Sequence, residues 1–351
     1  MTDVDTLVVL TPGFAENESD TTCLPFLQGH ISALGKNFPR LEIIILAFQY
    51  PYVKGIYKWN GIEVVSFDGR NRGKIYKLWL WVQVWRKLLE LKRTKKIIGL
   101  FSLWCTECAL IGSHFGKLYK LKHYTWLCGQ DAKAGNKYVK YIRPRSEELI
   151  AMSDFLKREF YKNYKILPAH VIPLGVSPEQ FLKDQQIRNI DLLGVGSLIP
   201  LKQYDVFIKV INELHAGFPE INAMIYGKGP EEEKLNKMIT DLRIQKNITL
   251  AGEIPHSEVL KSMQQAKIFL HTSNYEGFGT VCLEALYAGA HVVSFTKPMD
   301  IDIPHWHHVS NIEEMGNKVY ALLSDFQISH QLVCPFSSDD IAVSMMKLFC
   351  S

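Results

Sequence analysis

Short apolar runs alternate with segments of helical length along most of the chain, and this alternation limits the folds available to it. In the first half these runs occupy residues 7–10, 41–48, 62–67, 97–103, 123–127, 149–152 and 170–174. In the second half they occupy residues 191–195, 221–226, 248–251, 268–271 and 291–295. Strands that alternate with helices form βαβ units with parallel strands. The sequence therefore predicts the α/β class, with two doubly wound, Rossmann-like domains.

A boundary between the two domains is expected after residue 174. Residues 174–179 read Leu-Gly-Val-Ser-Pro-Glu, a glycine and proline segment that follows a predicted strand. We therefore expect an N-terminal domain at residues 1–174 and a C-terminal domain at residues 175–337, facing a cleft that binds ligands. Residues 338–351 are expected to form a short amphipathic helix that packs back on the N-terminal domain.

Composition argues against several classes of protein. The formal net charge is only +4, which argues against a general nucleic-acid binder. No apolar stretch is long enough to span a bilayer, and no basic start precedes an apolar run. With scattered cysteines, these features predict a cytoplasmic protein. Cys105 and Cys108 form a C-x-x-C without a second pair, so we interpret them as small buried residues rather than metal ligands.

Glycine turns follow consecutive predicted strands of the second half, and such turns lie at one edge of a parallel sheet. The first turn, at Gly196, is followed by Lys202, and the last contains Glu276, with Glu284 eight residues further on. Backbone N–H groups at helix starts, together with one cation, suit a diphosphate. Taken alone, the last turn could equally begin a buried helix whose glutamate hydrogen-bonds nearby backbone.

These residues resemble a known family. The segment 196–202, the sequence Gly227-Lys-Gly-Pro230, and Glu276-x7-Glu284 within Glu-Gly-Phe-Gly are similar to motifs of the retaining GT-B glycosyltransferases of family 4, or group 1. The resemblance covers residues 193–294. It implies that the C-terminal domain binds a nucleotide-sugar donor and that the N-terminal domain lies on the acceptor side.

The resemblance also implies roles for individual residues. Glu276 would contact the donor sugar near the reacting face, Lys202 would neutralise the leaving diphosphate, and Glu284 would hold the ribose hydroxyls. The backbone near Phe278 would meet the sugar and diphosphate, and Ile254 would border the base. The residues assigned to donor binding are Gly13, Gly196, Ser197, Lys202, Gly227, Gly229, Pro230, Ile254, Glu276, Gly277, Phe278, Gly279, Thr280 and Glu284.

The chain departs from the family pattern at two places. Ser197 stands where many members carry an arginine, which leaves Lys202 as the predicted cation for the diphosphate. Residues 99–105 lack the histidine that many members carry at this strand end. Two acidic residues, Asp131 and Glu107, are therefore candidates for the catalytic partner in the N-terminal domain. We favour Asp131, which follows the next strand, over Glu107. The alternative for both acids is a structural role as helix caps.

One basic, aromatic segment allows two interpretations. Residues 74–96 show helical periodicity, with Ile75, Leu78, Val82, Trp85 and Leu89 on one face and several lysines and arginines around it. Such a helix either lies on the surface of an anionic membrane or covers the predicted sheet with that face.

We predict a metal-independent transferase of hexosyl type, without a cofactor, that moves a sugar from a UDP- or GDP-type donor to an acceptor hydroxyl with retention. The acceptor is expected to be a glycan or lipid-linked molecule of bacterial-type synthesis. The alternatives are a sugar-nucleotide epimerase, a phosphorylase and a non-catalytic nucleotide-sugar-binding protein. The expected location is the cytoplasm, with peripheral contact to the inner face of the membrane if residues 74–96 bind lipid.

Overall fold

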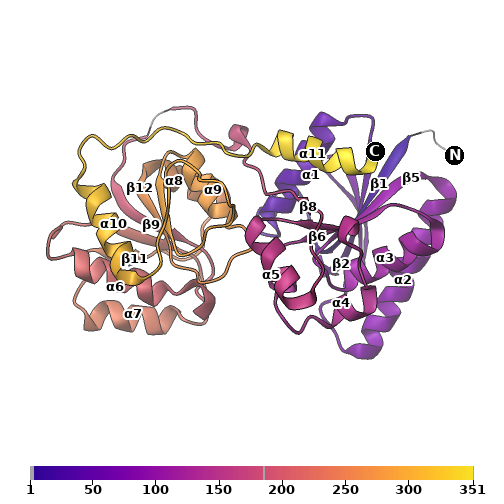
Figure 1. Cartoon of the computed structure of the whole chain (residues 1–351), viewed down its shortest axis with the longest axis horizontal. Coiled ribbons are helices and arrows are strands. Elements are labelled where there is room, and N and C mark those ends of the chain that lie inside the picture. Colours follow the sequence, from indigo (N-terminus) through magenta and orange to yellow (C-terminus); the bar gives the residue numbers. More distant parts are fainter. Residues whose placement is uncertain (1–3, 185, 351) are drawn as a thin grey trace. The chain divides into compact units, whose positions relative to one another are not determined.

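The computed structural model describes residues 4–184 and 186–350, which belong to two compact units (Figure 1). Unit 1 comprises Met1–Gly175 together with Ser338–Ser351, and unit 2 comprises Val176–Ser337. The chain therefore completes unit 2 before its last helix returns to unit 1. Each unit contains a mostly or wholly parallel sheet with helices on its faces, as the alternating sequence pattern predicts.

Unit 1 is built on an eight-stranded sheet in its described residues, with the strand order β3-β4-β2-β1-β5-β6-β7-β8. Neighbouring strands are parallel except for the antiparallel pair β3 and β4. Its strands are β1 (Asp5–Gly13), β2 (Glu42–Tyr50), β3 (Gly55–Trp59), β4 (Ile62–Ser66), β5 (Lys96–Leu103), β6 (His123–Leu127), β7 (Leu149–Ala151) and β8 (His170–Val171). Its α-helices are α1 (Pro25–Asn37), α2 (Lys74–Thr94), α3 (Glu107–Tyr119), α4 (Lys137–Ile142), α5 (Asp154–Tyr164) and α11 (Ser338–Cys350).

Unit 2 contains a six-stranded, all-parallel sheet within the described residues, with the order β11-β10-β9-β12-β13-β14. The chain order reverses between β9 and β12, and ligands of such sheets bind beyond the carboxyl ends of strands at this switch point. Its strands are β9 (Ile190–Val195), β10 (Ala223–Tyr226), β11 (Ile248–Leu250), β12 (Ala266–His271), β13 (His291–Ser294) and β14 (Trp306–His308). Its α-helices are α6 (Tyr204–Leu214), α7 (Glu232–Asp241), α8 (His256–Gln265), α9 (Thr280–Tyr287) and α10 (Ile312–Ser324).

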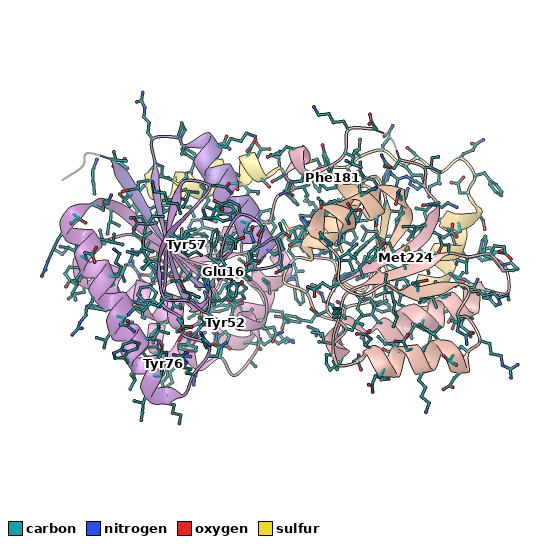
Figure 2. The ribbon with its side chains drawn as sticks, turned by 180° about the vertical axis from the view of Figure 1, so that it is seen from behind. Glu16, Tyr52, Tyr57, Tyr76, Phe181 and Met224 are labelled. Atoms are coloured by element: carbon teal, nitrogen blue, oxygen red, sulfur yellow. The ribbon has the colours of Figure 1, made fainter. Side chains whose placement is uncertain are left out.

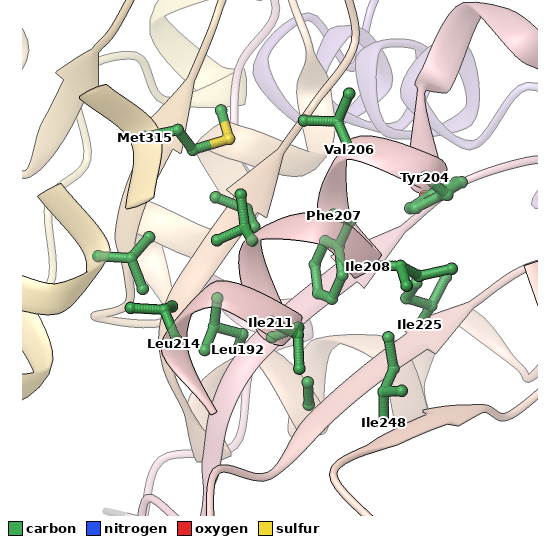
Figure 3. Close-up of a cluster of buried hydrophobic side chains, with 14 of the residues drawn as sticks. Leu192, Tyr204, Val206, Phe207, Ile208, Ile211, Leu214, Ile225, Ile248 and Met315 are labelled. Atoms are coloured by element: carbon green, nitrogen blue, oxygen red, sulfur yellow. The ribbon is translucent and has the colours of Figure 1, made fainter. Parts of the chain in front are cut away.

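The core of unit 2 forms where α6 covers the sheet (Figure 3). Apolar residues of α6 recur every three or four positions, so Phe207 and Ile211 share the face that packs on Leu192 and Ile225 of the strands. The strands themselves read as continuous apolar runs because a parallel sheet is covered on both faces. This packing places the carboxyl ends of β9 and β12 on a rigid support.

Two short edge strands, β3 and β14, were not predicted. Residues 55–59 and 306–308 lack a continuous apolar run, since an edge strand pairs on one side only and is partly exposed. Strand β14 carries Trp306 and two histidines, which the hydrophobic pattern does not mark as a strand. None of the described helices combines the length and the apolar character needed to cross a membrane.

Helix α2 covers the sheet with a face that the sequence pattern did not select. Its buried residues are Leu80, Val84, Leu88 and Leu91. Ile75, Leu78 and Val82, which we predicted to share a single apolar face with Trp85 and Leu89, are exposed instead. Trp85 and Leu89 are partly buried and pack against the core of unit 1. The interpretation that this face covers the sheet therefore fails for Ile75, Leu78 and Val82, because the helix is apolar on two opposite sides.

Helix α11 packs within unit 1, against α1 and the sheet. Phe349 contacts the rings of Phe101 and Tyr124 at centroid distances of 6.5 and 5.1 Å. Tyr124 donates a hydrogen bond to the carbonyl of Leu348, and Lys36 of α1 pairs with Asp339 at 2.7 Å. The ring of Phe349 lies directly over Gly99, whose missing side chain leaves room for it.

The Gly99→Ala substitution should destabilise unit 1 because the added Cβ would collide with the buried ring of Phe349. We expect a loss of about 1–3 kcal/mol in the free energy of unfolding. Urea titration followed by tryptophan fluorescence measures this, since all tryptophans except Trp306 lie in unit 1. Gly35→Ala in α1 is the matched control, and its Cβ would meet only Ile62 at 3.8 Å. Equal stability of Gly99→Ala and wild type would contradict this account of α11.

His30 of α1 should make unit 1 sensitive to acid. Its ring is buried beside Trp126, with no hydrogen bond to Nε2 from the described residues, and burial lowers its pKa to about 4. Because the unfolded chain takes up this proton near pH 6.5, stability falls as the pH drops from 6.5 to 4, by about 1.4 kcal/mol per pH unit. In His30→Phe this part of the slope should disappear in urea titrations across that range. If the free energy of unfolding of His30→Phe and of wild type falls equally with pH in this range, the role of His30 is refuted.

Candidate active site

Loops at the carboxyl ends of β9, β10 and β11 are joined by backbone hydrogen bonds. The N–H groups of Gly196 and Leu198 donate to the carbonyls of Tyr226 and Lys228, each at 2.9 Å. The N–H of Gly227 donates to the carbonyl of Gly252 at 2.8 Å. The N–H groups of Gly196 and Gly227 are therefore already engaged, and these glycines shape the floor of the site instead of offering donors to a ligand.

Glycine is required in this floor by the close approach of the loops. A Cβ at residue 227 would collide with the carbonyl oxygen of Gly196, and one at residue 229 would collide with the carbonyl of Leu198. Gly227 also has a φ of 146°, which L-residues rarely adopt. The motif Gly227-Lys-Gly-Pro230 thus has a structural explanation that holds whether or not a ligand binds.

Lys202 and Glu276 meet at the switch point of the unit 2 sheet. Lys202 ends the short 3₁₀ helix Pro200–Lys202 after β9, and Glu276 lies in the loop after β12. The Lys202 ammonium forms a salt bridge with Oε1 of Glu276. The hydroxyl of Thr272 donates to the carbonyl of Lys202 at 2.7 Å, which connects the two strand ends a second time.

His271, the last residue of β12, completes this cluster. Its Nε2 lies 3.4 Å from Oε1 of Glu276, a contact that is long for a hydrogen bond and that we treat as electrostatic. Neither ring nitrogen of His271 has a hydrogen-bond partner in the described residues, although the side chain is only 4% exposed. A buried ring with unsatisfied nitrogen atoms beside two charged groups points to a place where a polar ligand binds.

Glu276 carries its negative charge at all ordinary pH values. Burial alone would raise the pKa of Glu276, but the neighbouring His271 and the positive charge of Lys202 lower it to about 2. A carboxyl group with so low a pKa accepts a proton poorly near neutral pH. The group can, however, stabilise a positive charge that develops next to it.

Helix α9 begins directly after this loop. Gly279, at its N-cap, has a φ of 87°, and the first turn from Thr280 leaves N–H groups without intrahelical partners. Phe278 is buried, with its ring against Trp306 and Phe336, so its side chain belongs to the core. This helix start is a suitable site for an anion.

Glu284, one turn into α9, pairs with His256 at the start of α8. The His256 Nε2 lies 3.0 Å from Oε1 of Glu284, and both side chains are largely buried. This hydrogen bond raises the pKa of His256 above its ordinary value. Glu284 is thus held by a side chain of a neighbouring helix. The structural alternative had instead predicted a hydrogen bond from nearby backbone to this glutamate.

The predicted site residues are divided between the two units. Gly13, Glu107 and Asp131 belong to unit 1, and all the others belong to unit 2. In unit 2, Glu276, Gly277, Phe278, Gly279 and Thr280 are consecutive, and Lys202 reaches Glu276 directly. Ser197 is exposed beside Gly196 in the same floor. Gly229, Pro230 and Ile254 lie in the connections from β10 to α7 and from β11 to α8.

Asp131 has a mainly structural environment. Its carboxylate accepts hydrogen bonds from the backbone N–H groups of Cys105 and Gly129, both at 2.8 Å, and of Cys128 at 3.2 Å. It therefore ties together the ends of β5 and β6. This arrangement favours the structural alternative, and a catalytic role for Asp131 remains a prediction.

Glu107, the second acidic candidate of unit 1, lies in a buried polar network at the start of α3. Its carboxylate accepts hydrogen bonds from Gln49 and from the indole of Trp81, the latter at 3.0 Å, and pairs with Lys77 at 3.0 Å. Trp81 and Lys77 both belong to α2, so Glu107 joins α2 to the carboxyl edge of the sheet.

His271, Thr272 and His256 were missed in the sequence. The only available signal was position along the chain. His271 ends a predicted strand shortly before Glu276, Thr272 follows that strand directly, and His256 follows the Gly252 turn. Their partners lie on other elements, and spacing along the chain does not reveal such contacts. Among residues 4–184 and 186–350, no group of three or more histidine, cysteine, aspartate or glutamate side chains could hold a metal ion, and Cys105 and Cys108 are buried free thiols.

One part of the chain matches a known protein family. Residues 180–303 match the family of glycosyl transferases group 1. The phosphatidylinositol N-acetylglucosaminyltransferase GPI3 subunit of Saccharomyces cerevisiae is 29% identical over 161 residues, which are 43% of this chain and 36% of the yeast protein. The chain thus matches about a third of the length of that relative. A glycosyltransferase of Methanocaldococcus jannaschii is 25% identical over 282 residues, which are 77% of this chain and 76% of the archaeal protein.

The fold is similar to that of HepE from Anabaena, whose crystal structure contains UDP and glucose. The TM-score is 0.67 at 15% identity, and the likeness covers 98% of this chain and 97% of HepE. At this identity the likeness concerns the fold alone. The structural neighbours are GT-B glycosyltransferases with two Rossmann-like domains, which confirms the predicted fold class. Residues 180–303, which contain the unit 2 site residues, are thus similar to the glycosyl transferases group 1, the family whose motifs the sequence resembles.

Proposed function

We propose that this protein is a glycosyltransferase that moves a hexose-type sugar from a nucleoside-diphosphate sugar to an acceptor hydroxyl with retention at the anomeric carbon. The observation that carries the proposal is the cluster of Lys202, Glu276 and His271 beside the N-terminus of α9. It combines a cation and helix-end donors for a diphosphate with an ionised carboxylate for a sugar.

In the proposed reaction, the bond between the anomeric carbon and the diphosphate oxygen breaks, and the acceptor oxygen bonds to that carbon on the same face. The acceptor proton passes to the leaving diphosphate, which acts as the base. Lys202 stabilises the charge on the leaving group together with the first turn of α9. Glu276 remains ionised and stabilises the positive charge at the anomeric carbon, a task that its low pKa suits better than proton transfer.

Lys202 has enough hydrogen-bond donors to contact Glu276 and a diphosphate at the same time. An ammonium group carries three N–H bonds, so the side chain can keep its salt bridge to Glu276 while it contacts a phosphate oxygen. Because Lys202 and α9 provide positive charge, we propose that no metal ion or other cofactor is needed. Glu284, oriented by His256, would accept hydrogen bonds from the ribose hydroxyls.

The donor to test first is a UDP-sugar. HepE was solved with UDP and glucose, and the yeast relative is named for N-acetylglucosaminyl transfer. GDP remains the second candidate. The acceptor would be a glycan or lipid-linked hydroxyl of bacterial-type synthesis, met by unit 1 near Gly13 and Asp131, in the cytoplasm and without nucleic acid as a partner.

The function is tested by incubating the full chain with UDP-, GDP- and ADP-sugars and a panel of glycan and glycolipid acceptors. We expect release of one nucleoside diphosphate with an acceptor product of unchanged anomeric configuration. Glu276→Gln should lower kcat about 100-fold or more with a smaller change in donor affinity, because it removes the negative charge. Glu233→Gln, at an exposed position of α7, is the control.

Three other outcomes would contradict the proposal. Formation of a C2 epimer from the donor alone would identify an epimerase. Sugar 1-phosphate made from inorganic phosphate would identify a phosphorylase. Tight donor binding without transfer to any acceptor, unchanged in Glu276→Gln, would identify a binding protein.

Glu284→Ala should weaken nucleotide binding by about 1.5–3 kcal/mol, the value of a lost charge-assisted hydrogen bond. Isothermal titration with UDP and GDP measures the change, and a thermal melt confirms that the variant is folded. Glu258→Ala, an exposed carboxylate on α8, should bind like wild type. If folded Glu284→Ala also binds like wild type, the ribose assignment fails.

A further inference from the structure

Helix α2 presents a second apolar face to solvent. Its sheet-facing residues are Leu80, Val84, Leu88 and Leu91, and its exposed apolar residues lie about half a turn away. The exposed side chains, spaced one helical turn apart, are Ile75 (87% exposed), Leu78 (59%), Trp79 (49%) and Val82 (49%). A soluble protein rarely exposes so many large apolar side chains together unless the surface binds something.

Cations stacked on aromatic rings border this face. Lys54 lies over the ring of Trp79 at 5.2 Å, which brings the loop before β3 next to α2. Arg70 and Arg72 lie over Tyr52 and Tyr76 at 5.3 and 4.4 Å, and Figure 2 labels both tyrosines. Tyr52 and Val53 in the same loop are themselves exposed. We call this region, residues 52–54 with the exposed face of 70–82, the α2 surface.

The surroundings of the α2 surface are strongly basic. Residues 52–58 and 68–87 contain eight lysines and arginines and one acidic residue, Asp68, a local charge of +7 (8 − 1). The whole chain has a net charge of +4, so the remaining residues carry −3 (4 − 7). Asp68 is itself paired with Arg70 and Arg72. Glu107 and Glu90, outside these segments, pair with Lys77 and Lys87 and compensate two of the eight positive charges. Positive charge is thus concentrated on the segments that expose apolar and aromatic side chains.

An apolar groove continues the α2 surface toward α3. It has a volume of about 440 Å³, and its lining is almost wholly apolar. The lining residues are Leu78, Trp81, Val82, Trp85, Leu110, Ile111 and His114. Apolar side chains bordered by aromatic residues and a ring of cations match the layers of a membrane interface, in which acyl chains lie below aromatic residues and anionic headgroups.

We propose that the α2 surface docks on an anionic lipid bilayer. Ile75, Leu78 and Val82 would enter the headgroup and acyl boundary, with Trp79 and Tyr76 at the level of the headgroups. Lysines and arginines around them would pair with the lipid phosphates. Helix α2 would thereby bind lipid with one face and the sheet of unit 1 with the other.

The position of the α2 surface fits a lipid-linked acceptor, a step that rests on the proposed function. Helix α2 starts directly after β4, so its exposed apolar turns lie at the carboxyl edge of the unit 1 sheet. The Gly13 loop and the Asp131 loop lie at the same edge. Docking through α2 would bring a lipid-linked hydroxyl to the edge on which an acceptor is expected.

Co-sedimentation of the full chain with vesicles tests the proposal without donor or acceptor. We expect binding to vesicles that contain about 30 mol% phosphatidylserine, little binding to pure phosphatidylcholine, and weakening by salt. The double variant Ile75→Ser/Trp79→Ser and the variant Lys74→Glu should each lower the partition coefficient about tenfold or more. The matched controls, Phe326→Ser/Leu332→Ser and Lys246→Glu, change exposed residues of unit 2 and should bind like wild type.

Thermal melts establish that each variant is folded. Absence of vesicle binding by wild type, or equal loss in controls and α2 variants, would overturn the proposal. Sedimentation velocity tests whether a second copy of the chain binds the α2 surface instead. If wild type self-associates, Ile75→Ser/Trp79→Ser abolishes the self-association and no vesicle binding occurs, the surface is an interface between two copies of the chain. Since no sugar donor is present, these results leave the transferase proposal to be judged by its own assay.

Discussion

Hydrogen bonds between the backbones of adjacent loops hold the carboxyl edge of the unit 2 sheet in one arrangement. They run from Gly196 to Tyr226, from Leu198 to Lys228 and from Gly227 to Gly252. The loops approach so closely because residues 227 and 229 have no Cβ. Every candidate site residue of unit 2 extends from this edge or from a helix that starts there. The glycines therefore determine the geometry on which the charged side chains depend.

The salt bridge between Lys202 and Glu276 is a feature of the site more than of the fold. Bringing two charges out of water costs free energy that their attraction often fails to recover. Here the pair is partly buried, with His271 as a further neighbour whose nitrogen atoms lack partners in the described residues. Such an arrangement contributes little to stability but maintains strong local fields, which electrostatic catalysis requires.

The sequence predicted those parts of the molecule that depend on local pattern. Alternation of apolar runs and helices indicated the α/β class, and glycines at strand ends indicated the edge where Lys202 and Glu276 meet. Contacts between elements that are distant in the sequence could not be predicted from local pattern. The His256–Glu284 pair joins two helices, and the carboxylate of Asp131 accepts hydrogen bonds from two loops. The face of helix α2 that covers the sheet could not be chosen from the sequence, because periodicity locates an apolar stripe but does not distinguish a buried stripe from an exposed one.

The return of α11 to unit 1 has a consequence for the order of folding. Unit 2 is a continuous segment, Val176–Ser337, whereas unit 1 needs Phe349 to cover Gly99 and Phe101. During synthesis, the segment made second is complete while the segment made first still lacks a helix. Domains generally fold as units from the N-terminus. In this chain the order is reversed, because the sheet of unit 1 remains partly uncovered until α11 has been made.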